Sequence, residues 1–171
     1  MINDQPFQEY QPELVSRRGE ALAWVSTLLA ALGIIILIFS GQGVSWLVVL
    51  LQVILLLSAA IISLGNWSDR KTVLRLYDLG VEYRNGLRQA QLSWTDVKEV
   101  RVTPSPWGKK VQVYGEQNHF SFRTLAEVTV RGELKGRFGF TRGEEILREI
   151  VLRSNLEIMD DTGVGYYYVR K

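Results

Sequence analysis

Hydrophobic residues are concentrated in one block near the start of the chain. Between Glu20 and Asp69 there is no Asp, Glu, Lys, Arg or His, and most positions are Leu, Ile, Val or Ala. Two apolar segments, 21–39 and 44–64, are separated by the small polar turn 40–43. Each segment would form a helix about 30 Å long, close to the thickness of a bilayer core. The pattern predicts a hairpin of two transmembrane helices over 19–68, and the alternative is a buried helix pair in a soluble protein.

Tryptophans and basic residues mark the ends of the two segments. An indole prefers the membrane interface, where its ring meets lipid and its N–H meets water. We therefore predict interfacial anchors at Trp24, Trp46 and Trp67. The turn has no charge and basic residues flank the hairpin, so the positive-inside rule predicts a multi-pass plasma-membrane protein with both termini in the cytoplasm. The flanking residues are Arg17, Arg18, Arg70 and Lys71.

After residue 69 the pattern changes to short runs in which apolar and polar residues alternate, as they do in half-buried strands. Asn85 and Gly86 form a strong hairpin signal, because both residues tolerate positive φ. Pro104 and Pro106 end another run, since proline cannot donate to a sheet ladder. The runs predict a meander of about seven antiparallel strands, with the boundaries between 124 and 138 left open. The alternating runs are 73–77, 81–84, 87–94, 97–102, 111–114, 120–122, 128–130 and 134–140.

Beyond residue 140 the apolar positions recur with a helical period of 3.6. The segment 146–151 carries an apolar stripe, and charged residues occupy the opposite face. Thr141 and Glu144 have the spacing of a capping box, in which each side chain bonds the backbone amide of the other residue. We predict one amphipathic helix that ends at Asn155 and closes a domain over 69–155.

Both ends of the chain lie outside this pattern. Residues 1–18 are rich in Gln, Glu and Pro and have few apolar side chains, which predicts a flexible cytoplasmic leader. The extension 156–171 contains three tyrosines and a valine, which favour a strand over 166–169 after a turn at 160–163. That strand would extend the edge of the strand set or bind a partner by strand addition.

Composition narrows the possible chemistry. The chain has no cysteine, which excludes disulfides and thiol catalysis, and its single histidine, His119, cannot form a histidine-rich metal site. Asp160 and Asp161 are an isolated acidic pair and most simply form a turn. The net charge of +2 is too small to indicate nucleic-acid binding. We therefore expect no enzyme, and we expect no cofactor, metal or small-molecule substrate.

Four motifs in the segment 74–152 resemble those of a known family. They are LRLYDLGVEYRNG, LSWTDVKEVRV, HFSFRT and GFTRGEEILREIV. Together they resemble the bacterial pleckstrin-homology-like (PH-like) domains found in small membrane proteins. The resemblance implies a mainly-β barrel with one C-terminal helix. Two spans followed by such a domain are also similar in layout to the photosystem I assembly factor of chloroplasts and cyanobacteria, although this chain lacks most of that local sequence.

One loop has the composition of a contact site. Residues 104–110 combine two prolines with Trp107, Lys109 and Lys110, a set suited to touch lipid headgroups or an acidic partner. The alternative is that Trp107 folds back on the domain and the lysines are only solvated. The first turn of the domain is less suited to phosphate, because it carries Asp78 in place of Lys or Arg.

Three functional hypotheses follow. The first is a non-catalytic, membrane-anchored PH-like module that scaffolds or regulates membrane-protein partners at the cytoplasmic face. The second is an anionic-lipid-sensing domain that acts through Trp107, Lys109 and Lys110. The third is an accessory subunit of a membrane transporter or enzyme complex, in which Gln52 hydrogen-bonds across the helix pair or to another subunit. The expected partners are membrane lipids and either another membrane protein or a second copy of this chain.

Overall fold

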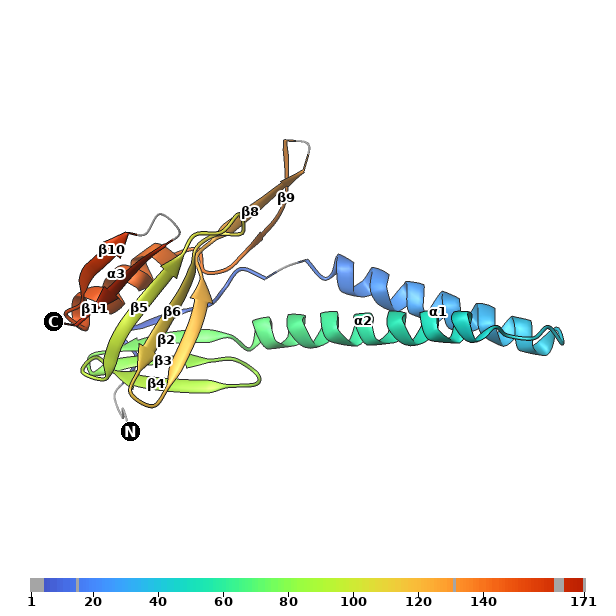
Figure 1. The fold of residues 1–171 in the computed structure, drawn as a ribbon, viewed down its shortest axis with the longest axis horizontal. Helices are drawn as coiled ribbons and strands as arrows, with labels where there is room; N and C mark the ends of the chain where they lie inside the picture. The colour runs from blue at the N-terminus through green and yellow to red at the C-terminus, as the bar shows by residue number, and fades with distance from the viewer. Residues whose placement is uncertain (1–4, 15, 131, 162–164, 171) are drawn as a thin grey trace. The chain divides into compact units, whose positions relative to one another are not determined.

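The computed structural model describes residues 5–14, 16–130, 132–161 and 165–170. The chain divides into two compact units, shown as a ribbon in Figure 1. The helical unit is Ser16–Trp67, and the β unit consists of Met1–Val15 together with Ser68–Lys171. The β unit is therefore assembled from segments on both sides of the helical unit in the sequence.

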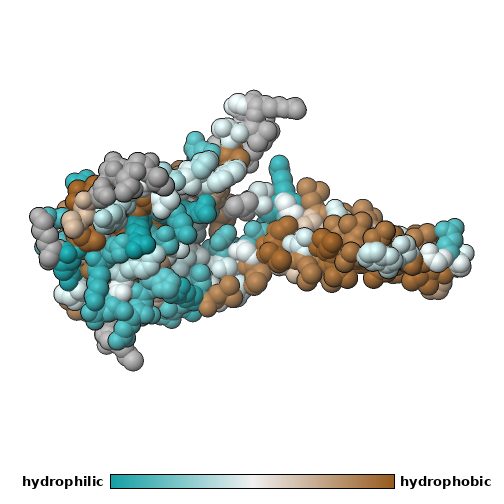
Figure 2. All heavy atoms as spheres, in the orientation of Figure 1, coloured by the Kyte–Doolittle hydropathy of each residue, from teal (hydrophilic) through white to brown (hydrophobic). Residues whose placement is uncertain are grey.

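The helical unit contains the predicted pair of long apolar helices, which run antiparallel beside each other (Figure 1). They are α1, Arg18–Phe39, and α2, Trp46–Arg70, and both are long and apolar enough to cross a membrane. Of their described residues, only Thr27 in α1 and Ala59 in α2 are buried. Large apolar side chains cover the outside of the pair, as the brown surface in Figure 2 shows.

Polar contacts join the two helices from the inside. Thr27 Oγ1 lies 3.3 Å from the carbonyl oxygen of Leu55 on the other helix. Gln52 Nε2 donates to the carbonyl oxygen of Thr27 at 3.2 Å, which confirms a hydrogen bond from this amide across the helix pair. Trp24 Nε1 donates to Ser63 Oγ at 2.8 Å. Such bonds fix the pairing of two helices whose outer surfaces are uniformly apolar.

The β unit contains three antiparallel sheets and one short helix (Figure 1). The four-stranded sheet has the order β1-β2-β3-β4, with bounds Gln8–Tyr10, Val73–Tyr77, Gly80–Arg84 and Gln89–Ser93. The five-stranded sheet has the order β10-β11-β5-β6-β7, with bounds Glu157–Asp161, Tyr166–Val169, Val97–Thr103, Lys110–Gly115 and His119–Arg123. The third sheet is the hairpin of β8, Ala126–Val130, and β9, Glu133–Phe138, and the helix is α3, Gly143–Arg153.

The two larger sheets and α3 share one hydrophobic core. Alternate residues point inward, so β6 buries Val111 and Val113 while β7 buries Phe120 and Phe122. The apolar stripe predicted for the helix covers the same core. Its members in the core are Ile146, Leu147 and Ile150. The two sequence periods therefore correspond to the inward faces of the strands and of α3.

The strands do not close into the single barrel that the sequence predicts. β8 and β9 instead form a separate hairpin that projects from the other two sheets (Figure 1). Of the described side chains in this hairpin, only Ala126 is buried, while Glu127, Thr129 and Arg137 are exposed. The described side chains of this hairpin are not part of the common hydrophobic core.

The N-terminal segment is the main correction to the predicted organisation. Residues 1–4 and 15 of the expected leader lie outside the described residues, but Gln8–Tyr10 forms β1 and pairs with β2. Tyr10 is buried in the common core, and Glu9 bonds Arg75 at 2.8 Å. One aromatic anchor and a sheet ladder therefore order a segment whose composition predicts flexibility.

Two local predictions also differ from the structure. Asn85 and Gly86 do lie in a hairpin, but neither has positive φ, and Asn85 Oδ1 instead accepts from the amides of Leu87 and Arg88. The predicted capping box is absent, because Thr141 Oγ1 donates to Glu13 at 3.1 Å. The predicted end of α3 is confirmed, with Asn155 at φ 51° just beyond the helix.

The C-terminal extension forms two strands. β11 contains the predicted run of three tyrosines and pairs with β5, so it extends the edge of the five-stranded sheet. β10 then pairs with β11 and becomes the new edge. Asp160 and Asp161 of the predicted turn belong to β10, while Thr162 and Gly163 lie outside the described residues.

Candidate binding cavity

Thr124 is the point where the loop 104–109, the end of β7 and the start of α3 meet. Its amide donates to the carbonyl of Lys109, and its Oγ1 accepts from the amide of Lys109, both at 3.0 Å. Gly108 has φ 77°, and a Cβ there would lie 2.7 Å from the carbonyl oxygen of Thr124. Gly143 packs equally closely, because its Cβ would lie 2.6 Å from Thr124 Cα. Glycine at these two positions lets three backbones converge and fixes the loop on the β unit.

The three residues predicted to act together in this loop have different contacts. Trp107 is 51% exposed and lies 6.3 Å, ring to ring, from Phe138. Lys109 Nζ bonds Glu144 Oε1 of α3 at 2.9 Å, and this hydrogen bond raises the pKa of the lysine above its ordinary value. Lys110 instead lines a cavity on β6. Of the three side chains, Trp107 is thus exposed, Lys109 is bound to α3 and Lys110 lines the cavity.

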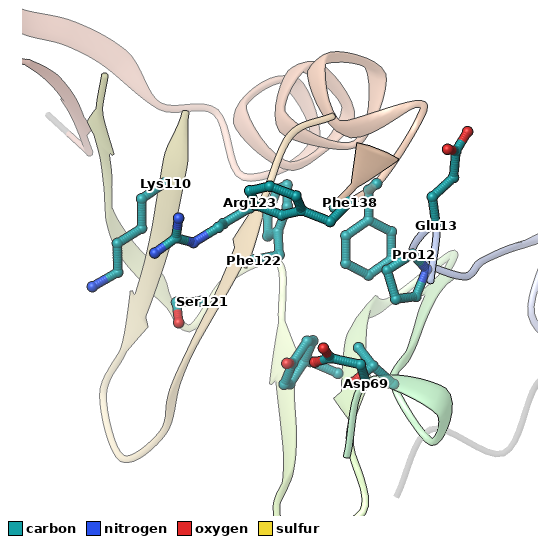
Figure 3. A pocket seen from close by; sticks show the side chains of 12 residues that line it. Pro12, Glu13, Asp69, Lys110, Ser121, Phe122, Arg123 and Phe138 are labelled. Atoms are coloured by element: carbon teal, nitrogen blue, oxygen red, sulfur yellow. The ribbon is translucent and has the colours of Figure 1, made fainter. Parts of the chain in front are cut away.

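Lys110 faces Arg123 across the β6–β7 ladder. The two residues are register partners at the end of this hairpin, and both line a cavity of about 300 Å³. Figure 3 shows both side chains, together with Ser121, on one side of that cavity. Within the described part of the chain, neither Lys110 nor Arg123 makes a side-chain hydrogen bond or ion pair. Two cations with no anionic partner thus lie next to each other at one wall.

The opposite wall of the cavity is apolar. Phe138 and Pro12 lie there in Figure 3, and Phe122 also lines the cavity. Two carboxylates also line the cavity, Glu13 and Asp69. Glu13 accepts a hydrogen bond from Thr141, and its carboxylate points away from the two cations in Figure 3. The cavity is therefore amphipathic, with its positive charge on the β6–β7 side.

Sequence reasoning missed Arg123 although a signal for it was present. The predicted runs 111–114 and 120–122 are consecutive strands of a meander, and the register of their hairpin places Lys110 opposite Arg123. Alternation puts both residues on the side of the ladder opposite Val111 and Phe122. No sequence pattern indicates that Glu13 and Asp69 line the same cavity, because both residues are far from Arg123 in the sequence.

The residues predicted at the membrane boundaries lie at the helix ends. Arg17 precedes α1, Arg18 begins it, Arg70 ends α2 and Lys71 follows it. The tryptophans differ in exposure, since Trp46 at the start of α2 is 70% exposed and Trp67 is 41% exposed. Trp24 is 37% exposed and also bonds Ser63 inside the helix pair.

The remaining sequence candidates have structural partners. Both ring nitrogens of His119 lie 3.2–3.3 Å from the Arg88 guanidinium. Asp78 in the first turn lies 3.9 Å from Arg153 of α3, and Arg75 bonds Glu9. In the part of the chain that the structure describes, no group of three or more His, Asp or Glu residues is placed to hold a metal ion.

Comparison with known proteins adds no relative: no family model, no curated protein and no solved structure matches the chain. The proposals below therefore rest on the residues and contacts of this chain.

Proposed function

We propose that this protein is a non-catalytic, membrane-anchored PH-like module that scaffolds or regulates a membrane-protein partner at the cytoplasmic face. The observation that carries the proposal is the pairing of β1 with β2. β1 precedes α1 and β2 follows α2, so the helix pair is an insertion between two neighbouring strands of one sheet. Both ends of the inserted hairpin must return to the same sheet, which supports a hairpin that enters and leaves one side of a membrane.

The surface of the helical unit supports the membrane part of the proposal. Leu28, Leu29 and Phe39 are exposed by 65%, 64% and 86%, and they are typical of the outer surface of both helices. Water would not stabilise a helix pair with this surface, whereas a lipid core would. Arginine and lysine lie beside both outer ends, and the turn at 40–43 has no charge, which favours a cytoplasmic β unit.

The order of elements supports the PH-like part. β2 to β7 form two antiparallel sheets in a meander, and α3 then covers their common core. This matches the order that the family resemblance implies, although β8 and β9 leave the sheets and β10 and β11 extend them. Two large sheets and one covering helix enclose one core and leave their outer surfaces available to a partner.

The edge strand β10 supports scaffolding through the β unit. It is the outermost strand of the five-stranded sheet, and Ile158 and Met159 on it are each 60% exposed. An open edge with apolar side chains can accept a strand from a partner. Gln52, by contrast, donates from Nε2 within the helix pair, and its Oε1 is buried there without a partner among the described residues, so a bond from this residue to another protein is less favoured.

Purification of the full chain from membranes in mild detergent tests the proposal. We expect one membrane protein to copurify at a fixed ratio, and we expect the double variant Ile158→Glu/Met159→Glu to lose it. The matched variant Gln52→Leu should retain it. Loss with Gln52→Leu and retention with the β10 variant would identify a hairpin-bound accessory subunit instead. Absence of any stoichiometric membrane partner would contradict scaffolding.

A further inference from the structure

We propose that the cavity between Lys110, Arg123 and Phe138 binds the phosphate-bearing headgroup of an anionic phospholipid. Two neighbouring cations lie at one wall of this cavity. Like charges on facing positions of neighbouring strands destabilise a sheet unless an anion lies between them. Lys110 and Arg123 occupy such positions, and neither has an anionic partner within the described residues.

Other cations on the same sheet and loop are paired. Lys98 bonds Glu116 at 2.8 Å, and Lys109 bonds Glu144 at 2.9 Å. Among the described cations of this sheet and of the loop 104–109, Lys110 and Arg123 are the two whose side chains make no hydrogen bond or ion pair. An ammonium, a guanidinium and the Ser121 hydroxyl together supply the donors that a phosphate accepts from.

The remainder of the cavity fits the part of a lipid that follows the phosphate. A volume of about 300 Å³ is at the lower end of small-ligand sites. Phe138 and Pro12 provide an apolar wall opposite the cations, as Figure 3 shows. An inorganic anion would leave this wall unused, whereas the glycerol and first methylenes of a phospholipid would contact it.

The position of the cavity in the chain connects it with the proposed anchor, on which this inference rests. Glu13 precedes α1 by five residues, Asp69 lies in the last turn of α2, and Thr72 follows that helix by two. If both helices cross a bilayer, the chain holds these wall residues within a few residues of its surface. The cavity would then lie within reach of the headgroups.

The test uses the purified full chain in dodecyl maltoside micelles, titrated with dioctanoyl phosphatidylglycerol. Lys110→Gln/Arg123→Gln should weaken binding about thirtyfold, from the usual effect of two cations on an anionic lipid. The matched control is Arg84→Gln/Arg148→Gln, which removes the same charge from two residues outside the cavity and should change binding less than twofold. Equal losses in both double variants, or none in the cavity variant, would overturn the proposal.

A second variant covers the case in which the cavity double variant fails to fold. Asp69→Asn removes an anion from the cavity wall and should tighten binding of dioctanoyl phosphatidylglycerol, by about threefold. Unchanged or weaker binding would contradict a phosphate in this cavity.

Two comparison ligands distinguish the source of the phosphate. We expect dioctanoyl phosphatidylcholine and glycerol 3-phosphate each to bind at least tenfold more weakly than the phosphatidylglycerol. Equal affinity for glycerol 3-phosphate would identify a soluble phosphate ester and overturn the lipid assignment. Alkaline carbonate extraction of membranes tests the proposed membrane anchor separately. A chain that carbonate extracts, but that still binds the lipid through Lys110 and Arg123, would contradict the anchor and leave the lipid site in place.

Discussion

The helical unit buries small side chains, whereas the β unit buries large apolar ones. In the helical unit the buried residues are Thr27 and Ala59, and leucines and isoleucines face outward. In the β unit, residues such as Phe120 and Ile146 are buried, and charged residues cover the surface, seen as teal in Figure 2. A unit that exposes leucine and isoleucine is suited to lipid, whereas a unit that buries its large apolar residues and exposes charged ones is suited to water. The contrast supports one chain built for two solvents.

The largest effect should come from the β-unit core. Phe120 is 2% exposed and stacks on Tyr83 at 5.3 Å, so Phe120→Ala should destabilise the β unit by about 3–5 kcal/mol. Urea unfolding in detergent, followed by near-UV and far-UV circular dichroism, should show loss of the β unit while the helices remain. Leu28→Ala, at an exposed helix position, is the control and should leave the β-unit transition unchanged. Joint loss of both signals would contradict independent units.

A matched pair of lysine substitutions tests whether the helical unit lies in lipid and the β unit in water. Leu29 in the helical unit and Leu79 in the β unit are both 64% exposed. Leu29→Lys should make the free energy of membrane insertion about 3 kcal/mol less favourable, because a lysine at the centre of a span must move from water into the lipid core. Leu79→Lys should change stability by less than about 0.5 kcal/mol. The fraction of each variant that resists carbonate extraction measures the difference, and equal fractions would place the helices outside lipid.

A smaller effect should follow from the N-terminal strand. Tyr10 is buried, and its hydroxyl donates to Gln8 at 2.7 Å, so Tyr10→Ala should cost about 2 kcal/mol and detach β1. Tyr10→Phe keeps the ring and should cost about 1 kcal/mol. Limited proteolysis before α1 reports the detachment. If the alanine variant resists protease as the wild type does, β1 is not what holds the N-terminal segment.

The smallest effect is a dependence on alkaline pH. Burial raises the pKa of Tyr10 above its ordinary value, so its phenol stays neutral longer in the folded β unit than in the unfolded chain. The stability that this contributes is present below pH 10 and is lost as pH rises through the folded pKa. Thermal unfolding of Tyr10→Phe should therefore lose less stability between pH 9 and pH 11 than the wild type. An equal loss of stability with pH in Tyr10→Phe and the wild type would contradict a raised pKa of Tyr10.

Local sequence patterns predicted most of the helices and strands. The features that they did not predict depend on contacts between residues far apart in the sequence. Alternation and the 3.6 period located the inward faces of β6, β7 and α3 before any tertiary contact was known. The pairing of Gln8–Tyr10 with β2 was not predictable in this way, because composition alone describes that segment as flexible and its partner lies beyond two helices. Lys110 was found as a basic loop residue, but its partnership with Arg123 depends on sheet register.

We propose that a hairpin whose two ends emerge on the same side of a membrane ties the β unit to that membrane. The chain has no cysteine, so single cysteines at Gln5, Gln42 and Leu87 can be labelled with a membrane-impermeant maleimide in sealed vesicles of known orientation. We expect Gln5→Cys and Leu87→Cys to react from the cytoplasmic side and Gln42→Cys to react only from the opposite side. Labelling of Gln5→Cys and Leu87→Cys from opposite sides, or of all three from one side, would contradict this proposal.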